Sequence, residues 1–543
     1  MPKQRVVDYV VDAVATLGVS HIFGVDGANI EDLYDAIFDA GTVQGVVAKH
    51  EFSAATMADG YARSTSGLGV VCATSGGGAM NLVAGLAESF ASRVPVLALV
   101  GQPPTQLEGH GAFQDTSGRA GAIDATQLFA SISRYCARVE RAADLPAQLR
   151  AAVAAARAGG PAVLLLPKDV QQQRAEFDSF RVPPRYPRRD PAGFEAVAAA
   201  IAGARRTGKI TIIAGDQVAR DDARAQLRML ATALDAAVGV APDAKDAYGA
   251  DEPGFCGVAG TMGNAELLDA VRQSALCLLV GTRLPVTARI ALGDTPLASI
   301  GVEAPFAPST HVTTDDLGAT LALLFERFGS RTAAEPRRTV LTTLPVPPAS
   351  GPGLRYRAAV DVLATEMPYG ADVYADAGNT GAAVVHHLPV RAGGRFVVAL
   401  GMGGMGYSFG AAIGSAFARR RRTFVIAGDG SFFMHGMEIH TAIEHGLPVT
   451  FVVFNNNAHA MCVTREQVYY RDRYSFNRFR RSELGAGIAA MFPGLPACTA
   501  RTVDELQQAL RTPAGGPKFI AVECDPDEIP PFTPFLDALR SNA

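Results

Sequence analysis

One segment near the carboxyl end, residues 423–457, constrains this chain more than any other. It begins with the apolar run 423–427, which is typical of a buried parallel strand, and continues through a Gly-Asp-Gly-Ser turn at 428–431. A helix is predicted from Phe432 to His445, and a second strand from Pro448 to Phe454 runs into three asparagines. The pattern predicts a βαβ unit with polar turns at the carboxyl ends of both strands, where ligands bind in open α/β sheets.

The two turns of this unit carry ligands for a hard cation. Asp429 and Asn456 are 456 − 429 = 27 positions apart, and both offer oxygen atoms of the kind that Mg²⁺ prefers. Gly428 and Gly430 let backbone N–H groups approach phosphate oxygens, and Ser431 follows them directly. A Gly-Asp-Gly triplet alone is a common turn, but with the asparagines at this spacing it predicts a metal and diphosphate site.

Composition limits the classes of function. With 543 residues, 48% hydrophobic and 19% charged, the chain is predicted to fold into three or four globular domains. A net charge of −4 without a long basic run argues against nucleic acid as a partner. No apolar stretch approaches the roughly 18 residues of a membrane span, and the first residues lack the apolar region of a signal peptide. Seven scattered cysteines favour a cytoplasmic protein over a disulfide or zinc framework.

Two polar, proline-rich segments, 171–191 and 334–353, are predicted linkers. They divide the chain into domains at 1–175, 192–335 and 354–535. Strand-like and helix-like runs alternate in each part. The predicted fold is therefore α/β, with three doubly wound parallel-sheet domains.

Several motifs of the first part occur in a recognisable order. They are His50-Glu51 followed by ADGYAR at 58–63, TSGGG at 74–78 with Asn81, VGQPP at 100–104, AFQD at 112–115 and GPAVLLLPKDV at 160–170. Together with the Gly-Asp-Gly and asparagine turns, they resemble the thiamine diphosphate (ThDP) decarboxylase and acetohydroxyacid (acetolactate) synthase family. The resemblance covers essentially the whole chain and implies pyrimidine-binding, central and diphosphate-binding domains in that order.

The resemblance implies a role for Glu51. A glutamate here hydrogen-bonds N1′ of the cofactor's aminopyrimidine, so that the 4′-imine can remove the C2 proton. Without the resemblance, an acid in the first turn of a helix is the simpler interpretation. In Gly401–Ser408 the Gly403 carbonyl is expected to accept from the 4′-amino group, and Met405 is expected to separate the two cofactor rings. Packing in the core is the alternative for Met405.

Further cofactor and metal contacts follow from the same resemblance. Mg²⁺ is expected on Asp429, Asn456 and the backbone carbonyl of Ala458. The expected ThDP contacts are Gly27, Asn81, Asn379, Thr380, Gly403, Met405, Gly428, Gly430 and Ser431. The central domain holds FAD in acetohydroxyacid synthases, but scaffolding is an equal alternative here, so no FAD residues are named.

Five positions bear on the choice of reaction. Phe113 and Gln114 resemble the pocket-lining pair of the synthases, and the small Ala28 stands where simple decarboxylases often carry a proton donor. His110 is either a substrate contact or an ordinary loop histidine. Arg465 replaces the tryptophan that selects the acceptor in acetohydroxyacid synthases. It either binds a carboxylate or phosphate of the acceptor or is a solvated side chain.

The expected reaction is decarboxylation of a 2-keto acid, pyruvate by default, followed by carboligation of the resulting enamine to a second carbonyl. A homodimer or homotetramer is implied, because family members build each site from two subunits. The alternatives are a non-ligating 2-keto acid decarboxylase, a hydrolase or lyase acting on a C–C bond, and a non-catalytic relative that keeps the fold.

Overall fold

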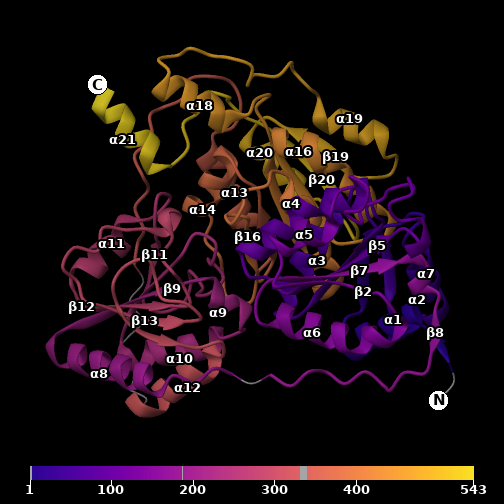
Figure 1. Cartoon of the computed structure of the whole chain (residues 1–543). Helices are drawn as coiled ribbons and strands as arrows, with labels where there is room; N and C mark the ends of the chain where they lie inside the picture. Colours follow the sequence, from indigo (N-terminus) through magenta and orange to yellow (C-terminus); the bar gives the residue numbers. More distant parts are fainter. Residues whose placement is uncertain (1–2, 186, 330–338, 543) are drawn as a thin grey trace. The chain divides into compact units, whose positions relative to one another are not determined.

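Three parallel β-sheets of six strands each organise the chain, and each sheet is flanked by helices (Figure 1). The computed structural model describes residues 3–185, 187–329 and 339–542. The α/β fold with three parallel-sheet domains that the sequence predicts is therefore confirmed. Among the described residues, no helix has the length and apolar character needed to cross a membrane.

The first sheet lies in the amino-terminal part of the chain. Its strands are β2 (His21–Val25), β3 (Gln44–Val47), β4 (Gly69–Ala73), β5 (Val96–Gln102), β6 (Tyr135–Arg138) and β7 (Pro161–Pro167). The helices of this region are α1 (Val6–Thr16), α2 (Glu31–Ala40), α3 (Glu51–Thr65), α4 (Gly77–Ala91), α5 (Ala125–Ala130), α6 (Leu145–Arg157) and α7 (Lys168–Gln171). A separate antiparallel pair joins β1 (Gln4–Arg5) to β8 (Arg174–Ala175). Every residue of β5 and β7 is buried, as expected for central strands covered on both faces.

The second sheet belongs to the central part of the chain. Its strands are β9 (Lys209–Ala214), β10 (Ala237–Val240), β11 (Phe255–Val258), β12 (Ser274–Val280), β13 (Leu297–Gly301) and β14 (Thr310–Thr313). The helices are α8 (Pro191–Thr207), α9 (Asp216–Arg220), α10 (Arg224–Leu234), α11 (Ala265–Arg272) and α12 (Leu317–Phe328). Helices α8 and α11 both pack against this sheet.

The third sheet lies in the carboxyl-terminal part. Its strands are β15 (Asp372–Ala375), β16 (Phe396–Val398), β17 (Thr423–Gly428), β18 (Val449–Asn455), β19 (Ala497–Ala500) and β20 (Lys518–Glu523). The helices are α13 (Tyr356–Glu366), α14 (Asn379–His387), α15 (Tyr407–Arg419), α16 (Asp429–His435), α17 (Ile439–Glu444), α18 (Ala460–Tyr469), α19 (Leu484–Met491), α20 (Val503–Arg511) and α21 (Thr533–Asn542).

The first and third sheets share one strand order, and the second has another. When the strands of each sheet are numbered along the chain, the first and third read 2-1-3-4-6-5 and the second reads 3-2-1-4-5-6. In the first and third sheets the direction of winding reverses between β2 and β4 and between β15 and β17. Crevices at such switch points, at the carboxyl ends of the strands, are where doubly wound sheets bind ligands.

The structure divides into two compact units that are described separately. Unit 1 comprises Met1–Arg185, Ala399–Thr423 and Phe433–Val449, and unit 2 comprises Tyr186–Val398, Phe424–Phe432 and Thr450–Ala543. Each of the three sheets falls within one predicted domain, but the units follow contacts rather than chain order. The boundaries 1–175, 192–335 and 354–535 therefore stay predictions, and residues 330–335 of the second domain lie outside the described residues.

One predicted element differs in the structure. The single helix expected from Phe432 to His445 is instead α16, a 3₁₀ turn at Gly436–Glu438 and α17. The backbone leaves the helical region at His435 and Gly436 follows, where the missing side chain lowers helix propensity. The Gly-Asp-Gly-Ser turn is also shorter than predicted, because α16 already begins at Asp429.

Within unit 1, glycines let α3 and α15 pack with their backbones in close contact. A Cβ atom on Gly60 would overlap the carbonyl of Ala411, and one on Gly414 would overlap the carbonyl of Met57. The packing therefore depends on the absence of side chains at these positions.

Gly414→Ala is expected to destabilise the protein by about 1–3 kcal/mol, because neither backbone can yield to the added methyl group. Urea unfolding followed by circular dichroism measures the loss. Gly77→Ala in α4 is the matched control, because a Cβ there meets no atom within 4 Å and should cost nothing. Equal stability of the two variants would contradict the close-packing argument.

Candidate active site

The predicted metal ligands come together at the carboxyl ends of neighbouring strands in unit 2. Asp429 begins α16 at the end of β17, and Asn456 and Ala458 follow the adjacent β18. The backbone N–H of Gly430 donates to Asp429 Oδ1 at 3.0 Å. The N–H groups of Asn457 and Ala458 also hydrogen-bond the Asp429 carboxylate. The turn after β18 is thus folded around the acidic side chain.

The Asp429 carboxylate has the features of a cation ligand. It is 1% exposed, and Oδ2 has no hydrogen-bond partner among the described residues. Burial raises its pKa to about 7, since a buried charge lacks the solvation of water. A buried carboxylate oxygen without a partner requires a proton or a cation.

The remaining donors match a cation that prefers oxygen. Asn456 is 5% exposed; its Nδ2 donates to the hydroxyl of Tyr356 at 3.1 Å, and its Oδ1 accepts from the N–H of Ala458 at 3.1 Å. The described residues contain no group of three His, Cys, Asp or Glu side chains that could hold a metal. A cation at Asp429 would therefore be held by one carboxylate, amide and backbone oxygens and water, a donor set that suits Mg²⁺ better than zinc.

The predicted diphosphate contacts surround this site. Asn379 and Thr380 begin α14, which follows β15 after the short turn 376–378. Asn379 Nδ2 donates to Thr464 Oγ1 at 3.0 Å, whereas its buried Oδ1 has no partner among the described residues. A Cβ on Gly428 would approach only Thr380 Oγ1, at 3.8 Å, so the space there is open. Ser431, in the first turn of α16, donates its hydroxyl to Asp376 at 2.9 Å. Unpaired N–H groups at helix starts favour phosphate oxygens.

Glu51 lies at the first residue of α3 in unit 1 and is 9% exposed. Asn81 of α4 donates its Nδ2 to Glu51 Oε2 at 2.9 Å. A Cβ on Gly78 would lie 3.0 Å from Glu51 Oε1, so the glycine leaves room beside that oxygen. The structure therefore pairs the predicted proton carrier with Asn81, which was predicted to contact the cofactor itself.

Gln114 and Gly27 lie next to this pair. Thr74 Oγ1 and Gln114 Oε1 are hydrogen-bonded at 3.2 Å, and Thr74 also packs against Gly27 and Gly78. Gln114 has a left-handed backbone with φ of 59°, a conformation that costs energy for a residue with a side chain.

The predicted substrate residues are placed at the surface. Phe113 is 77% exposed, and the side chains of His110 and Ala28 are exposed as well. The carbonyl of Ala28 accepts from Lys168 Nζ at 2.8 Å. Arg465 is exposed on α18 of unit 2. The side chains of Phe113, His110, Ala28 and Arg465 are thus exposed rather than fixed by buried hydrogen bonds.

The glycine-rich segment 401–406 lies beside the start of α3 in unit 1. Gly403 has φ of 67° and open space where a Cβ would be, while Met405 is half-buried. A Cβ on Gly404 would lie 3.4 Å from the ring of Phe52, the neighbour of Glu51. Three of the predicted pyrimidine contacts, Glu51, Gly403 and Met405, are thus on adjoining segments.

Sequence reasoning missed Glu438, which holds the start of α3. Glu438 is 1% exposed, and its Oε1 accepts from the N–H groups of Lys49 at 2.8 Å and His50 at 3.1 Å. His435 stacks on Phe52 with ring centroids 4.3 Å apart, and burial lowers its pKa to about 4. Glu438 stands in the mixed segment MEIHTAI at 437–443, and no motif of the sequence singled it out.

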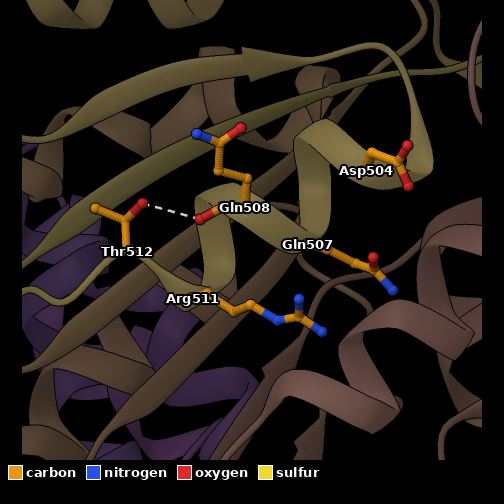
Figure 2. A pocket seen from close by; sticks show the side chains of 5 residues that line it. All are labelled: Asp504, Gln507, Gln508, Arg511 and Thr512. Carbon is orange, nitrogen blue, oxygen red and sulfur yellow. Dashed lines mark hydrogen bonds between the residues drawn. The ribbon is translucent and has the colours of Figure 1, made fainter.

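Two other regions are not assigned to the candidate site. The glycine turns of the central sheet are filled by the chain itself: a Cβ on Gly215 would overlap Thr282, and one on Gly260 would overlap the carbonyl of Thr287. These glycines serve loop packing, and no residue is assigned to FAD. A hollow on α20 contains none of the predicted site residues; it is lined by Asp504, Gln507, Gln508, Arg511 and Thr512 (Figure 2).

Comparisons with known proteins identify the family of the chain. Three models of thiamine pyrophosphate enzymes match the chain: the N-terminal TPP-binding domain at residues 4–122, the central domain at 194–301 and the C-terminal TPP-binding domain at 376–524. The acetolactate synthase large subunit of Parasynechococcus marenigrum is 30% identical over 86% of this chain and 78% of its own length. The chain therefore belongs to the thiamine pyrophosphate enzyme family, and the resemblance seen in the motifs is confirmed.

Within that family, acetolactate synthases are prominent among the relatives. A protein of Methanocaldococcus jannaschii described as an acetolactate synthase large subunit is 29% identical over 97% of this chain and 93% of its own length. The large subunit of acetolactate synthase isozyme 2 of Escherichia coli is 27% identical over 95% of both chains. A solved structure, described as a thiamin diphosphate-dependent enzyme from Mycobacterium smegmatis, has a TM-score of 0.79 at 23% identity and covers 96% of this chain and 99% of that one. That likeness bears on the fold alone.

Proposed function

We propose that this chain uses ThDP and Mg²⁺ to decarboxylate a 2-keto acid, pyruvate by default, and to join the remaining acyl unit to a second carbonyl. The near-full-length similarity to acetolactate synthase large subunits carries this proposal. When bound, ThDP supplies an electron sink for the carbanion that loss of CO₂ creates. The relatives do not favour the non-ligating decarboxylase.

The residues of unit 1 are assigned to the reacting half of the cofactor. Glu51, oriented by Asn81, holds a proton against N1′ of the aminopyrimidine. The Gly403 carbonyl accepts from the 4′-amino group, and Met405 packs between the rings. Gly27 and Gln114 line the same pocket beside Thr74.

The residues of unit 2 are assigned to the diphosphate half. Asp429, Asn456 and the carbonyl of Ala458 hold Mg²⁺, and the unpaired Oδ2 of Asp429 supports this assignment. The start of α14 offers the N–H groups of Asn379 and Thr380 to the phosphate oxygens, and Gly430 and Ser431 are the proposed contacts at the start of α16, where the Gly430 N–H already donates to Asp429 Oδ1.

Three further proposals concern the assembled protein. The site is completed in a homodimer or homotetramer. Light scattering measures this oligomeric state. The protein works in the cytoplasm, because all seven cysteines lie in the described residues and are free, as is typical of a reducing compartment. The visible absorption spectrum of the purified protein decides whether FAD is bound.

The function is tested by incubating the protein with ThDP, Mg²⁺ and pyruvate, and by recording CO₂ and products by mass spectrometry. Acetolactate is the expected product, and omission of ThDP should abolish it. Free acetaldehyde alone would replace the proposal with a plain decarboxylase. No CO₂ in the presence of bound ThDP would exclude pyruvate as the donor.

Arg465 is proposed to bind the carboxylate or phosphate of the acceptor. Arg465→Gln should raise the KM for the acceptor by about 10- to 100-fold, because a charge-assisted contact is lost, and should leave the donor KM unchanged. Steady-state kinetics with varied acceptor measure the effect. Arg471→Gln, a surface arginine beyond the same helix, is the control. An unchanged acceptor KM would identify Arg465 as a solvated side chain.

A further inference from the structure

Glu88 of α4 is buried and holds the glycine-rich segment 401–403 within unit 1. Its side chain is 2% exposed. Oε2 accepts from the backbone N–H of Met402 at 2.6 Å and of Gly403 at 3.3 Å, and Oε1 accepts from the N–H of Gly401 at 3.2 Å. One carboxylate therefore binds three consecutive backbone donors.

Three successive N–H groups that point to one place form an anion-binding concavity, and the left-handed φ of 67° at Gly403 is typical of such a bend. Here the anion is a side chain of the protein. The three bonds orient the three successive peptide groups that lead to the Cα of Gly403. The next peptide group carries the Gly403 carbonyl, so only the two backbone torsions of Gly403, φ and ψ, separate that carbonyl from the fixed part of the segment.

Glu88 is itself held in place from two sides. Ser92 donates its hydroxyl to Glu88 Oε1 at 2.7 Å, and Arg63 of α3 lies 3.6 Å from the same oxygen. Arg63 also pairs with Asp59 at 2.6 Å. Asp59 is fully buried and accepts from the hydroxyl of Tyr407, the first residue of α15. The glycine-rich segment is thus fastened at its beginning by Glu88 and at its end by Asp59.

Such fastening matters because the segment has little order of its own. Four of its six residues from 401 to 406 are glycine, and the chain loses more conformational entropy on ordering glycine than any other residue. Residues 401–403 are exposed, and Met402 is 62% exposed, so apolar packing does not hold them. Hydrogen bonds that the backbone N–H groups donate to the buried Glu88 carboxylate take the place of that packing.

We propose that Glu88 is a positioning residue that holds segment 401–405 in its cofactor-binding shape before ThDP arrives. This inference rests on the proposed function, because it takes the Gly403 carbonyl and Met405 as contacts of the cofactor. Glu88 touches neither substrate nor cofactor. Because Glu88 orders the segment beforehand, ThDP binding does not carry the entropy cost of ordering it.

The positioning role and a general stabilising role of Glu88 predict different effects when the carboxylate is removed. The packing of α3 on α15 is made by the glycines described above, which do not involve Glu88. Loss of the carboxylate should therefore loosen the segment and leave the helices in place, and water can reach the exposed N–H groups. If Glu88 instead stabilised the whole unit, its loss would loosen all of it.

The first test is amide hydrogen exchange of the apoprotein, read by mass spectrometry for the variants Glu88→Gln and Glu88→Ala. Exchange in the peptide covering 399–407 should become about 10- to 100-fold faster, more so for alanine, with other peptides unchanged. Glu140→Gln is the control, since that side chain is 57% exposed and pairs with Arg138 at the surface. Unchanged exchange at 399–407, or faster exchange throughout unit 1, would overturn the proposal.

The second test is calorimetric titration of ThDP in excess Mg²⁺. Glu88→Gln should weaken binding by about tenfold or more, and Glu140→Gln should not. Wild-type affinity in Glu88→Gln, despite a faster-exchanging segment, would overturn the positioning role. Failure of the wild-type protein to bind ThDP would instead refute the proposed function, while the exchange test would still decide whether Glu88 holds the segment.

Discussion

Glu51→Gln is expected to lower kcat for CO₂ release by about two to four orders of magnitude. Glutamine keeps the size of the side chain and can still accept from Asn81, but it cannot carry the proton that N1′ requires. Because the folded structure and the pocket volume are retained, the affinity for ThDP should change only a few-fold. Steady-state rates and calorimetric ThDP titration separate the two effects.

Glu444→Gln is the matched control for this experiment. Glu444 lies in the same unit, is 43% exposed and pairs with Lys49 near the start of α3. Its rates should match those of the wild type. A fully active Glu51→Gln variant would refute the assignment of Glu51 as the proton carrier and with it the proposed mechanism.

Asp429→Asn is expected to abolish Mg²⁺-dependent binding of ThDP, with a rise in the dissociation constant of about 100-fold or more. The amide removes the only carboxylate assigned to the cation, and its NH₂ group would face the cation with the wrong polarity. Titrating ThDP at a series of Mg²⁺ concentrations measures the change. Removal of divalent cations with a chelator should release ThDP from the wild-type protein in the same way.

Asp361→Asn provides the comparison, because that carboxylate is 64% exposed on α13 and pairs with Arg357 at the surface. It should bind ThDP with the wild-type Mg²⁺ dependence. Retention of that dependence in Asp429→Asn would place the cation elsewhere.

Much of the fold could be predicted from local patterns. The runs 423–427 and 448–454 are apolar and continuous, and they became the buried strands β17 and β18. Parallel strands that are neighbours in a sheet bring their following turns together. The proximity of Asp429 to the turn after β18 therefore followed from sequence. The break in the helix at Gly436 did not, because one glycine in a helical pattern is usually tolerated.

The site residues also divide into those that sequence motifs marked and those whose placement only the structure gave. Glu51, Gly403 and Asp429 were assigned to the site because motifs of fixed spacing surround them. The exposure of Phe113 and His110 was not foreseen, since a loop sequence does not tell which way its side chains point. The pairing of Asn81 with Glu51 was also unforeseen, although both residues had been assigned to the site.

The sequence by itself determined the three parallel sheets, the family and the turns that carry the predicted ligands. These depend on periodicity, glycine positions and spacing within one βαβ unit. Only the tertiary structure decided what holds those turns in place. Glu88 binds backbone groups 313 to 315 positions away, and Glu438 binds groups 388 and 389 positions away. Any residue can offer a backbone N–H, so such contacts leave no trace in the sequence of the segment that is held.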